Sequence, residues 1–462
     1  MPDSSSYKNV TSLPPSYPAG RFGGHLREFW RDRTGFLVRQ AALGDVSYYR
    51  LLSQPVFFIN HPDLVRDMLV VSSHKFVKGR ALQRSRAMLG NGLLTNEGSE
   101  HLRQRRMIQP AFHRTRIAEY ARSMVAYADE MANAWRDGQI YDIDQEMMHL
   151  TLRIVGKTLF DAEVSDDADR IGQAMTTLVD LFNFLLLPFS EWLEKLPLPQ
   201  SVRFKRARRT LDEIVYGIIN ERRRSGEDKG DLLSMLLLAQ DEDDGSTMTD
   251  EQVRDEALTL FLAGHETTAN ALTWTWYLLS QNPEAENKMH QELDAVLCDP
   301  EGQRPKAEAR IPTIEDLPNL KYTESVLAES MRLYPPAWAI GRNAVESHEF
   351  NGFTASPGTL VLSSPFVMHR DARFWDDPLV FNPERWESQS VKEAGQRNIY
   401  FPFGGGVRRC IGESFAWTEG ILLLATIARK WKLSLVPGQR IQVKPLITLR
   451  PKNGVKMKLA TR

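Results

Sequence analysis

Cys410 stands in a sequence that could make its sulfur reactive. The segment YFPFGGGVRRCIGESF, residues 400–415, places it after a glycine run and two arginines, and before an apolar helical pattern. A thiolate, the form that attacks or binds a metal, is favoured by nearby cations and by a helix N-terminus. The flanking glycines let the backbone approach a bulky, flat group. The segment therefore points to thiolate chemistry.

Three interpretations of Cys410 agree with its residue types. A lone cysteine is most often a small, buried hydrophobic side chain. A phosphate-binding loop is the second, although GGGVRRC lacks the Gly-Lys-Ser/Thr ending of a P-loop. The third is a haem whose iron takes a single thiolate ligand, which favours cleavage of the O–O bond. Backbone N–H groups of such a loop could donate hydrogen bonds to the sulfur and tune the metal.

A second segment places polar side chains inside an apolar helical pattern. The stretch FLAGHETTANALTWTWYLL, residues 261–279, contains Gly264, Glu266, Thr267 and Thr268. Glycine in a helix interior costs about 1 kcal/mol, and threonine hydroxyls that bond back to carbonyls bend helices. The zinc motif HExxH is excluded, because Ala269 stands where its second histidine is needed. A helix with one exposed polar face and a site that uses an acid and an alcohol both remain open.

These segments together resemble the cytochrome P450 family. The haem-binding signature of that family, F-G-x-G-x-R-x-C-x-G, is filled here by Phe403, Gly404, Gly406, Arg408, Cys410 and Gly412. The resemblance implies haem b (iron protoporphyrin IX) as the cofactor, with Cys410 as the protein ligand of the iron. It covers roughly residues 20–460 and implies the P450 fold, an α-helical bundle around the haem with a minor β-rich region.

The sequence AGHETT, residues 263–268, is similar to the oxygen-activating sequence of that family. The resemblance implies that Ala263 lies against the haem, that Glu266 relays protons, and that Thr267 holds dioxygen and steers its protonation. Peroxide-driven and rearranging members usually lack this acid–alcohol pair. Its presence therefore implies a monooxygenase that receives electrons from a reductase system.

A charged framework is implied in the same way. Glu329 and Arg332 in ESMRLYPP share one helix face and match the E-x-x-R pattern of the family, with Arg385 in FNPERW as the third member. Taken alone, such a pair is usually a solvated surface pair. The resemblance instead gives these three residues a structural role, supporting the cysteine loop from a buried position.

The two haem propionates need cationic partners, and arginine suits carboxylates. The candidates are Arg105, Arg342 and Arg408. The family often has a tryptophan four residues before the first of these, and His101 stands there in this chain. A histidine can still donate to a propionate. The alternative for Arg105 is a surface arginine on a basic helix.

A basic run follows the same helix, with Arg103, Arg105, Arg106, Arg114 and Arg116. Such a run is usually a solvated face, but it could also be a docking patch for an acidic electron donor. No flavin or iron–sulfur module is recognisable in the chain. We therefore expect a separate donor, namely a ferredoxin, a flavodoxin or an FMN protein.

Composition narrows the class of protein. The 462 residues carry 58 basic and 59 acidic side chains, a formal net charge of -1, so no global field attracts nucleic acid. Only Cys298 and Cys410 occur, which excludes a disulfide scaffold and suits a reducing cytoplasm. The first twenty residues lack a signal-peptide core, and the apolar segment 178–199 is too charged to span a bilayer. We expect a cytoplasmic protein with no membrane span.

The elements that must position these residues are mostly helices. Alternating aromatic and β-branched residues predict strands within 46–62, and helical patterns cover 101–135, 168–186, 206–224 and 251–281. An acidic turn, 241–246, precedes the last of these, and Thr249 and Gln252 have capping-box spacing. Short strands follow residue 335, and 441–460 is interpreted as a hairpin with its turn at 452–454. An apolar helix follows Cys410, with Glu413 and Glu419 early, as the helix dipole prefers. We predict a mainly α protein with small β-sheets, a single domain over 1–462, in which 1–20 form a flexible N-terminal segment.

The predicted function is a haem-thiolate monooxygenase that inserts one atom of O₂ into a lipophilic small molecule, by hydroxylation or epoxidation of a fatty acid, terpenoid, steroid or polyketide. The resemblance implies a substrate pocket lined by residues 79–94, 178–188 and 336–340 with Phe261 and Ala263, although core packing would explain the apolar residues of 178–188 equally well. The alternatives are a haem-based gas sensor or carrier, a peroxide-driven or rearranging P450, and a non-haem protein whose glycine loop binds phosphate.

Overall fold

The computed structural model describes residues 13–20, 23–161, 168–182, 196–240, 245–298 and 309–462. It is mainly helical with small sheets, which confirms the predicted fold class. The chain divides into two compact units, the first made of residues 1–80, 339–378 and 395–409, and the second of 81–338, 379–394 and 410–462. The single domain over 1–462 stays a prediction. Residues 1–12, 183–188 and 241–244, which belong to the predicted N-terminal segment, pocket wall and acidic turn, lie outside the described residues.

The first unit contains most of the sheet structure. Its helical segments are α1 (Leu26–Arg31), α2 (Arg33–Ala41), α3 (Pro62–Arg66), η1 (Asp67–Val71), η2 (Ser73–Lys75), α17 (Pro365–Met368) and η6 (Gly406–Arg408). Its strands are β1 (Val46–Leu51), β2 (Gln54–Ile59), β3 (Phe76–Lys78), β5 (Ile340–Ala344), β6 (His348–Phe350), β7 (Phe353–Ala355) and β8 (Leu360–Ser363).

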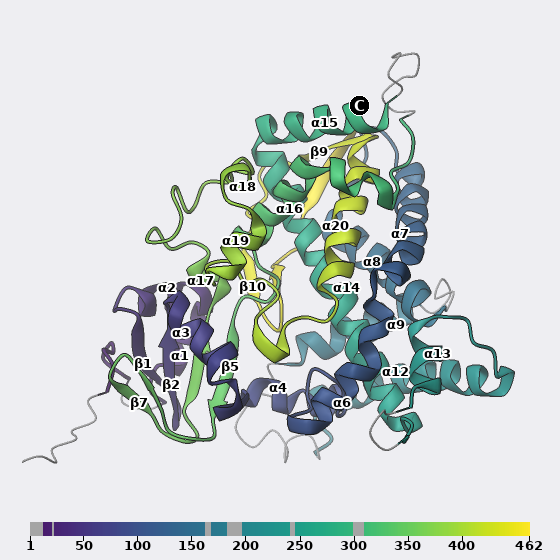
Figure 1. Ribbon diagram of the computed structural model, residues 1–462. Helices are drawn as coiled ribbons and strands as arrows, with labels where there is room; N and C mark the ends of the chain where they lie inside the picture. The colour runs from purple at the N-terminus through teal and green to yellow at the C-terminus, as the bar shows by residue number, and fades with distance from the viewer. Residues whose placement is uncertain (1–12, 21–22, 162–167, 183–195, 241–244, 299–308) are drawn as a thin grey trace, which may run out of the picture. The chain divides into compact units, whose positions relative to one another are not determined.

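A five-stranded sheet in the order β1-β2-β8-β5-β3 organises this unit. The pair β2–β8 is parallel and the other pairs are antiparallel. The strands predicted within 46–62 are β1 and β2, and β2 ends in a continuous buried apolar run from Val56 to Ile59. Such a run is typical of a strand that is covered on both faces. Figure 1 shows α2 alongside β1 and β2, on which it packs.

The second unit contains most of the helices. They are α4 (Arg80–Arg84), α5 (Arg86–Leu89), α6 (Gly98–Ile108), η3 (Gln109–Phe112), α7 (Arg114–Ala134), α8 (Ile143–Phe160), α9 (Ala168–Asp180), α12 (Pro199–Ser225), α13 (Leu232–Leu238), α14 (Asp250–Gln281), α15 (Pro283–Leu297), η5 (Ile314–Asn319), α16 (Lys321–Leu333), α18 (Arg385–Ser388), α19 (Val391–Gln396) and α20 (Glu413–Ala428). Its strands are β4 (Ile140–Asp142), β9 (Trp431–Leu435), β10 (Val443–Pro445), β11 (Leu449–Pro451) and β12 (Lys456–Thr461).

Helix α14 is the central element of the second unit. It begins at a capping box in which Thr249 accepts from the backbone of Gln252 while the Gln252 side chain accepts from Thr249 N, as the spacing predicted. Helices α8, α12, α16 and α20 pack against it (Figure 1). Most of its side chains are buried as a result, including polar ones such as Glu266 and Asn270. Polar atoms in such a helix need partners or a function.

The predicted C-terminal hairpin is wrong in its pairing. Strand β10 pairs with β11 across residues 446–448, whereas β12 pairs with β9 and β4 in a separate three-stranded sheet. The predicted turn does exist, because Gly454 has a φ of 70°. It leads the chain from one sheet into another. Alternation indicates that a segment is a strand, but it does not identify the partner.

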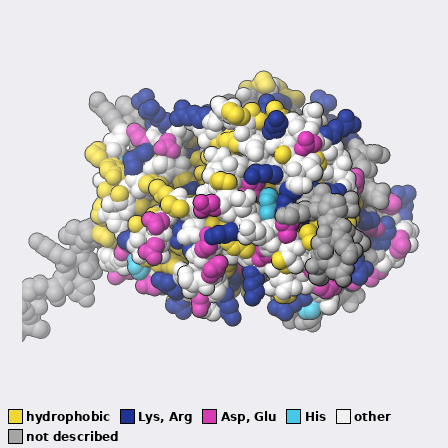
Figure 2. Space-filling view, turned by 90° about the horizontal axis from the view of Figure 1, so that it is seen from above, with side chains coloured by type: hydrophobic (Ala, Val, Ile, Leu, Met, Phe, Trp, Pro, Cys, Tyr) yellow, Lys and Arg dark blue, Asp and Glu magenta, His cyan; other side chains and the backbone are white. Residues whose placement is uncertain are grey.

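The surface carries charges of both signs. Figure 2 shows Lys and Arg side chains interspersed with Asp and Glu over the face that it presents, which agrees with the formal net charge of -1. Among the described helices, none combines the length and the apolar run that a bilayer crossing requires.

Candidate functional site

The cysteine loop is shaped by two glycines with left-handed backbone. Gly404 and Gly406 have φ values of 71° and 65°, which side chains rarely adopt. A Cβ on Gly406 would also lie only 1.9 Å from the carbonyl oxygen of Leu69. The loop can therefore reach this packing against η1 only with glycine at position 406.

Cys410 follows this loop at the start of the segment that leads into α20. Its side chain is exposed and does not form a disulfide. Helix α20 begins at Glu413 after the N-cap residue Gly412, so the thiol lies close to a helix N-terminus, where a thiolate is favoured. An exposed thiol next to a helix N-terminus is not the small buried side chain of the first interpretation.

The middle of α14 has an uncovered turn. Ala263 is exposed, and Gly264 and Thr267 are half-buried, although Phe261, Leu262, His265 and Glu266 around them are buried. Thr267 Oγ1 donates to the carbonyl oxygen of Ala263 at 2.6 Å. This apolar turn with one hydroxyl fits a flat, largely apolar group lying against the helix. This turn and the exposed thiol of Cys410 therefore fit the binding of a haem.

Glu266 points to a different environment from Thr267. Its carboxylate is buried and pairs with Arg450, whose Nε lies 2.7 Å from Oε1. Thr448 donates to the same oxygen. The other oxygen, Oε2, is buried and has no hydrogen-bond partner among the described residues. Glu266, the acid of the predicted acid–alcohol pair, is thus bound to the β10–β11 hairpin through Oε1 alone among the described residues.

The residues of the predicted charged framework lie together. Glu329 is fully buried, and its carboxylate accepts from Arg332 Nε and Nη2, both at 2.8 Å, and from Arg385 Nε at 2.9 Å. Asn382 N at 3.0 Å and Trp386 Nε1 at 3.2 Å complete the set of donors. These last two donors were not predicted, although both belong to the segment FNPERW that contains Arg385. Five donors compensate for the burial of one carboxylate.

The candidate propionate partners are divided between the two units. His101 is buried and Arg105 half-buried one turn later on α6 in the second unit. Arg342 lies on β5 and donates to the carbonyl oxygen of Gly341 at 3.0 Å. Arg408 is the last residue of η6. Arg342 and Arg408 belong to the first unit together with Phe403, Gly404 and Gly406, whereas Cys410 and Gly412 belong to the second.

Glu419 is a buried acid that the sequence analysis misinterpreted. It lies in the second turn of α20, beyond the reach of the helix N-terminus, and is fully buried. Neither of its carboxyl oxygens has a hydrogen-bond partner among the described residues. Burial raises the pKa of Glu419 to about 8. The Thr268 hydroxyl opposes this shift from nearby, although its geometry does not make a hydrogen bond to either oxygen. The interpretation of Glu419 as a dipole-favoured early acid is therefore wrong.

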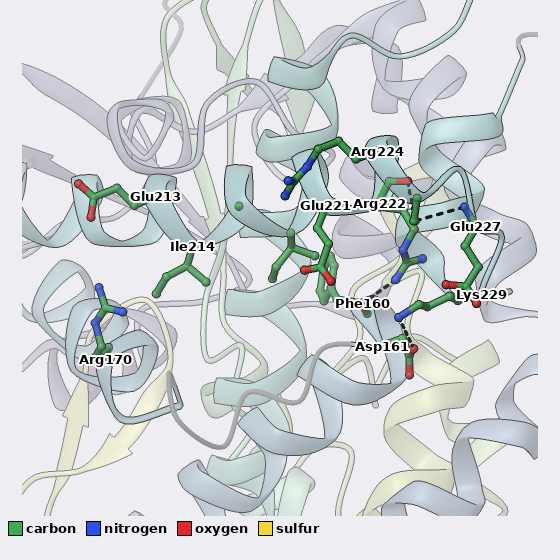
Figure 3. Close-up of a pocket in the computed structure, with 13 residues that line it drawn as sticks. Phe160, Asp161, Arg170, Glu213, Ile214, Glu221, Arg222, Arg224, Glu227 and Lys229 are labelled. Atoms are coloured by element: carbon green, nitrogen blue, oxygen red, sulfur yellow. Dashed lines mark hydrogen bonds and ion pairs between the residues drawn. The ribbon is translucent and has the colours of Figure 1, made fainter.

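A pocket of 570 Å³ lies elsewhere in the second unit (Figure 3). Residues of α12 form much of its wall, and the ion pairs Arg222–Asp231 (2.7 Å) and Lys229–Asp161 (3.2 Å) lie beside it. Charges of both signs line this pocket. It contains none of the predicted site residues, so it is not the candidate site.

No group of three or more His, Cys, Asp or Glu side chains that could hold a metal ion occurs in the described part of the chain. A single exposed thiol suits a metal that brings most of its ligands with it, as haem does.

Comparison with known proteins gives a consistent result. The family model described as Cytochrome P450 matches residues 24–459. Cyclooctatin synthase and cyclooctat-9-en-7-ol 5-monooxygenase, both from Streptomyces melanosporofaciens, are each 38% identical to this chain, over 92% and 90% of it and over 91% and 88% of their own lengths. Pentalenene oxygenase from Streptomyces avermitilis is 34% identical over 95% of both chains.

Proposed function

The chain belongs to the cytochrome P450 family and is a haem-dependent monooxygenase acting on a lipophilic substrate, and we propose that this substrate is a terpenoid. The proposal rests on the relatives, whose names specify oxidation of cyclooctat-9-en-7-ol and of pentalenene. The apolar turn at Ala263 supports it, because it offers no charge to a carboxylate substrate. The family match over residues 24–459 leaves the phosphate-loop alternative without support.

Haem b is the proposed form of the cofactor, held by Cys410 as its thiolate ligand. The N-terminus of α20 favours the ionised sulfur, and Gly404 and Gly406 keep side chains away from the approach. When bound, the haem supplies the reduction and cleavage of dioxygen. His101, Arg105, Arg342 and Arg408 are the proposed partners of its propionates, and Phe403, Gly412 and Ala263 the proposed apolar contacts.

Thr267 and Glu266 are the proposed proton-handling residues. Insertion of one oxygen atom and release of the other as water consumes two electrons and two protons, so protons must reach a site from which bulk water is excluded. The Thr267 hydroxyl lies on the uncovered turn of α14, where it can orient a hydrogen-bonded oxygen. Glu266 is the neighbouring acid, and its Oε2 is buried without a hydrogen-bond partner among the described residues.

Electrons are supplied by a redox partner, and we propose that it is an acidic protein of the ferredoxin, flavodoxin or FMN type. Arg106 and Arg114 are exposed on α6 and α7. Opposite charge on a partner would speed its docking there. The cytoplasmic location stays a prediction.

The carbon monoxide spectrum of the reduced protein tests the thiolate assignment. A Soret band shifted far to the red, lost in Cys410→Ser, is expected from thiolate ligation. A band typical of histidine ligation in the unmodified protein would overturn it.

Binding spectra with a panel of terpenes, fatty acids, steroids and polyketides then test the substrate class, and tighter binding of every terpene than of any fatty acid is expected. Preference for another class would refute the terpenoid proposal alone.

Thr267→Ala tests the proton-handling role. A general acid–base group contributes about 10²–10⁴-fold to the rate of its step, so the substitution should raise the hydrogen peroxide released per electron pair at least about ten-fold. Thr275→Ala is a matched control, because Thr275 Oγ1 makes the same bond to the carbonyl one turn earlier, Ala271 O at 2.7 Å, from a buried position. Equal uncoupling in both variants would mean that Thr267 only supports the helix.

A further inference from the structure

The carboxylate of Glu266 joins α14 to the β10–β11 hairpin. Arg450 and Thr448 both donate to Oε1, and Thr448 Oγ1 in turn accepts from Asn270 Nδ2 at 3.2 Å. Trp274 Nε1, two turns further along α14, donates to Leu449 O at 2.8 Å. The hairpin is thus bonded to three successive turns of the helix. These bonds fix the position of Oε1.

The second oxygen of Glu266 is in the opposite situation. Oε2 is buried and has no hydrogen-bond partner among the described residues. A buried carboxylate oxygen without a partner is costly, and it is usually explained by a bound water or by a function. Arg450, only 11% exposed, compensates the negative charge from the side of Oε1. Oε2 is therefore the oxygen of this carboxylate whose hydrogen-bonding capacity is unused among the described residues.

We propose that Arg450 is a positioning residue that holds Glu266 by Oε1 and keeps Oε2 as the oxygen that accepts and releases protons. The inference rests on the proposed function of Glu266. In each transfer Oε2 takes up one proton from water and gives it up again, so the carboxylate is restored and no electron moves.

Variants of the holoenzyme test the positioning role first. Arg450→Gln should raise hydrogen peroxide release per electron pair at least about ten-fold at unchanged haem content, and Arg450→Lys should restore most of the coupling. Arg440→Gln is the control, because Arg440 is an exposed arginine of the same C-terminal region and its loss should change coupling less than about two-fold. If Arg450→Gln unfolds, Thr448→Val removes the second donor to Oε1 and should uncouple in the same direction. Equal coupling in Arg450→Gln and Arg440→Gln would overturn the inference.

The result for Glu266→Gln separates this inference from the proposed function. If Glu266→Gln and Thr267→Ala both leave coupling intact, the proposed proton-handling role fails and the inference fails with it. If Glu266→Gln uncouples turnover whereas Arg450→Gln does not, only the inference fails.

Discussion

Glu419→Gln should stabilise the protein near neutral pH. Glu419 is fully buried in α20 without a hydrogen-bond partner among the described residues, and burial raises its pKa from 4.5 to about 8. The folded protein therefore holds a proton on this carboxyl that the unfolded chain releases above about pH 4.5. Glutamine has the shape of the protonated acid and carries no proton to lose.

The magnitude follows from linkage between proton binding and unfolding. Between pH 4.5 and pH 8 the folded state binds the proton more tightly, so the free energy of unfolding falls as the pH rises. Each pKa unit is worth about 1.36 kcal/mol. The burial of Glu419 therefore lowers the free energy of unfolding by about 1 kcal/mol at pH 5 and by about 3 kcal/mol at pH 7, relative to its value at low pH. This lowering of the free energy of unfolding vanishes below pH 4.5 and no longer changes above pH 8.

Urea unfolding of the wild-type protein and the variant at several pH values measures this effect. The gain in free energy of unfolding from Glu419→Gln should increase by about 2 kcal/mol between pH 5 and pH 7. Glu349→Gln, at an exposed position on β6, is the control and should show no such increase. A gain for Glu419→Gln that does not change with pH would refute the reasoning, because the carboxyl would then be ionised in the fold.

Two further substitutions test the support of the cysteine loop. Glu329→Gln removes the charge that two arginines share and should lower the free energy of unfolding by about 3–5 kcal/mol. The control Glu130→Gln, in a surface pair with Arg153, should lower it by no more than about 1 kcal/mol in the same urea titration. Similar losses in the two variants would contradict a buried ionic framework. Gly406→Ala should cost about 2 kcal/mol or more and reduce haem content, since its Cβ would meet Leu69 O. Gly358 has a φ of 87° but open space around it, so Gly358→Ala should lower the free energy of unfolding by only about 1 kcal/mol. An equal loss at both glycines would mean that backbone strain alone, and not the contact with Leu69 O, is the cause.

Local patterns in the sequence were sufficient to predict several helices and strands. The capping box at Thr249 and Gln252 depends on residues three positions apart, and the structure contains it. The strands β1 and β2 and the helix after Cys410 likewise follow from periodicity and composition. Each of these features is determined by neighbours along the chain.

Features that depend on distant partners could not be predicted from the sequence. Arg450 is separated from Glu266 by 184 residues, and a charged residue in a short strand is typical of a solvent-facing position. Glu419 resembles a residue placed for the helix dipole until its burial is known. The pairing of β12 with β9 and β4 instead of β10 is an error of the same kind.

The short bond from Thr267 to Ala263 O limits what the threonine can do. A hydroxyl has one hydrogen, and this one is already directed to the helix backbone at 2.6 Å. In this rotamer Thr267 can only accept a hydrogen bond from a molecule on the uncovered turn. To act as a donor, its side chain must first rotate and break a bond worth about 1 kcal/mol.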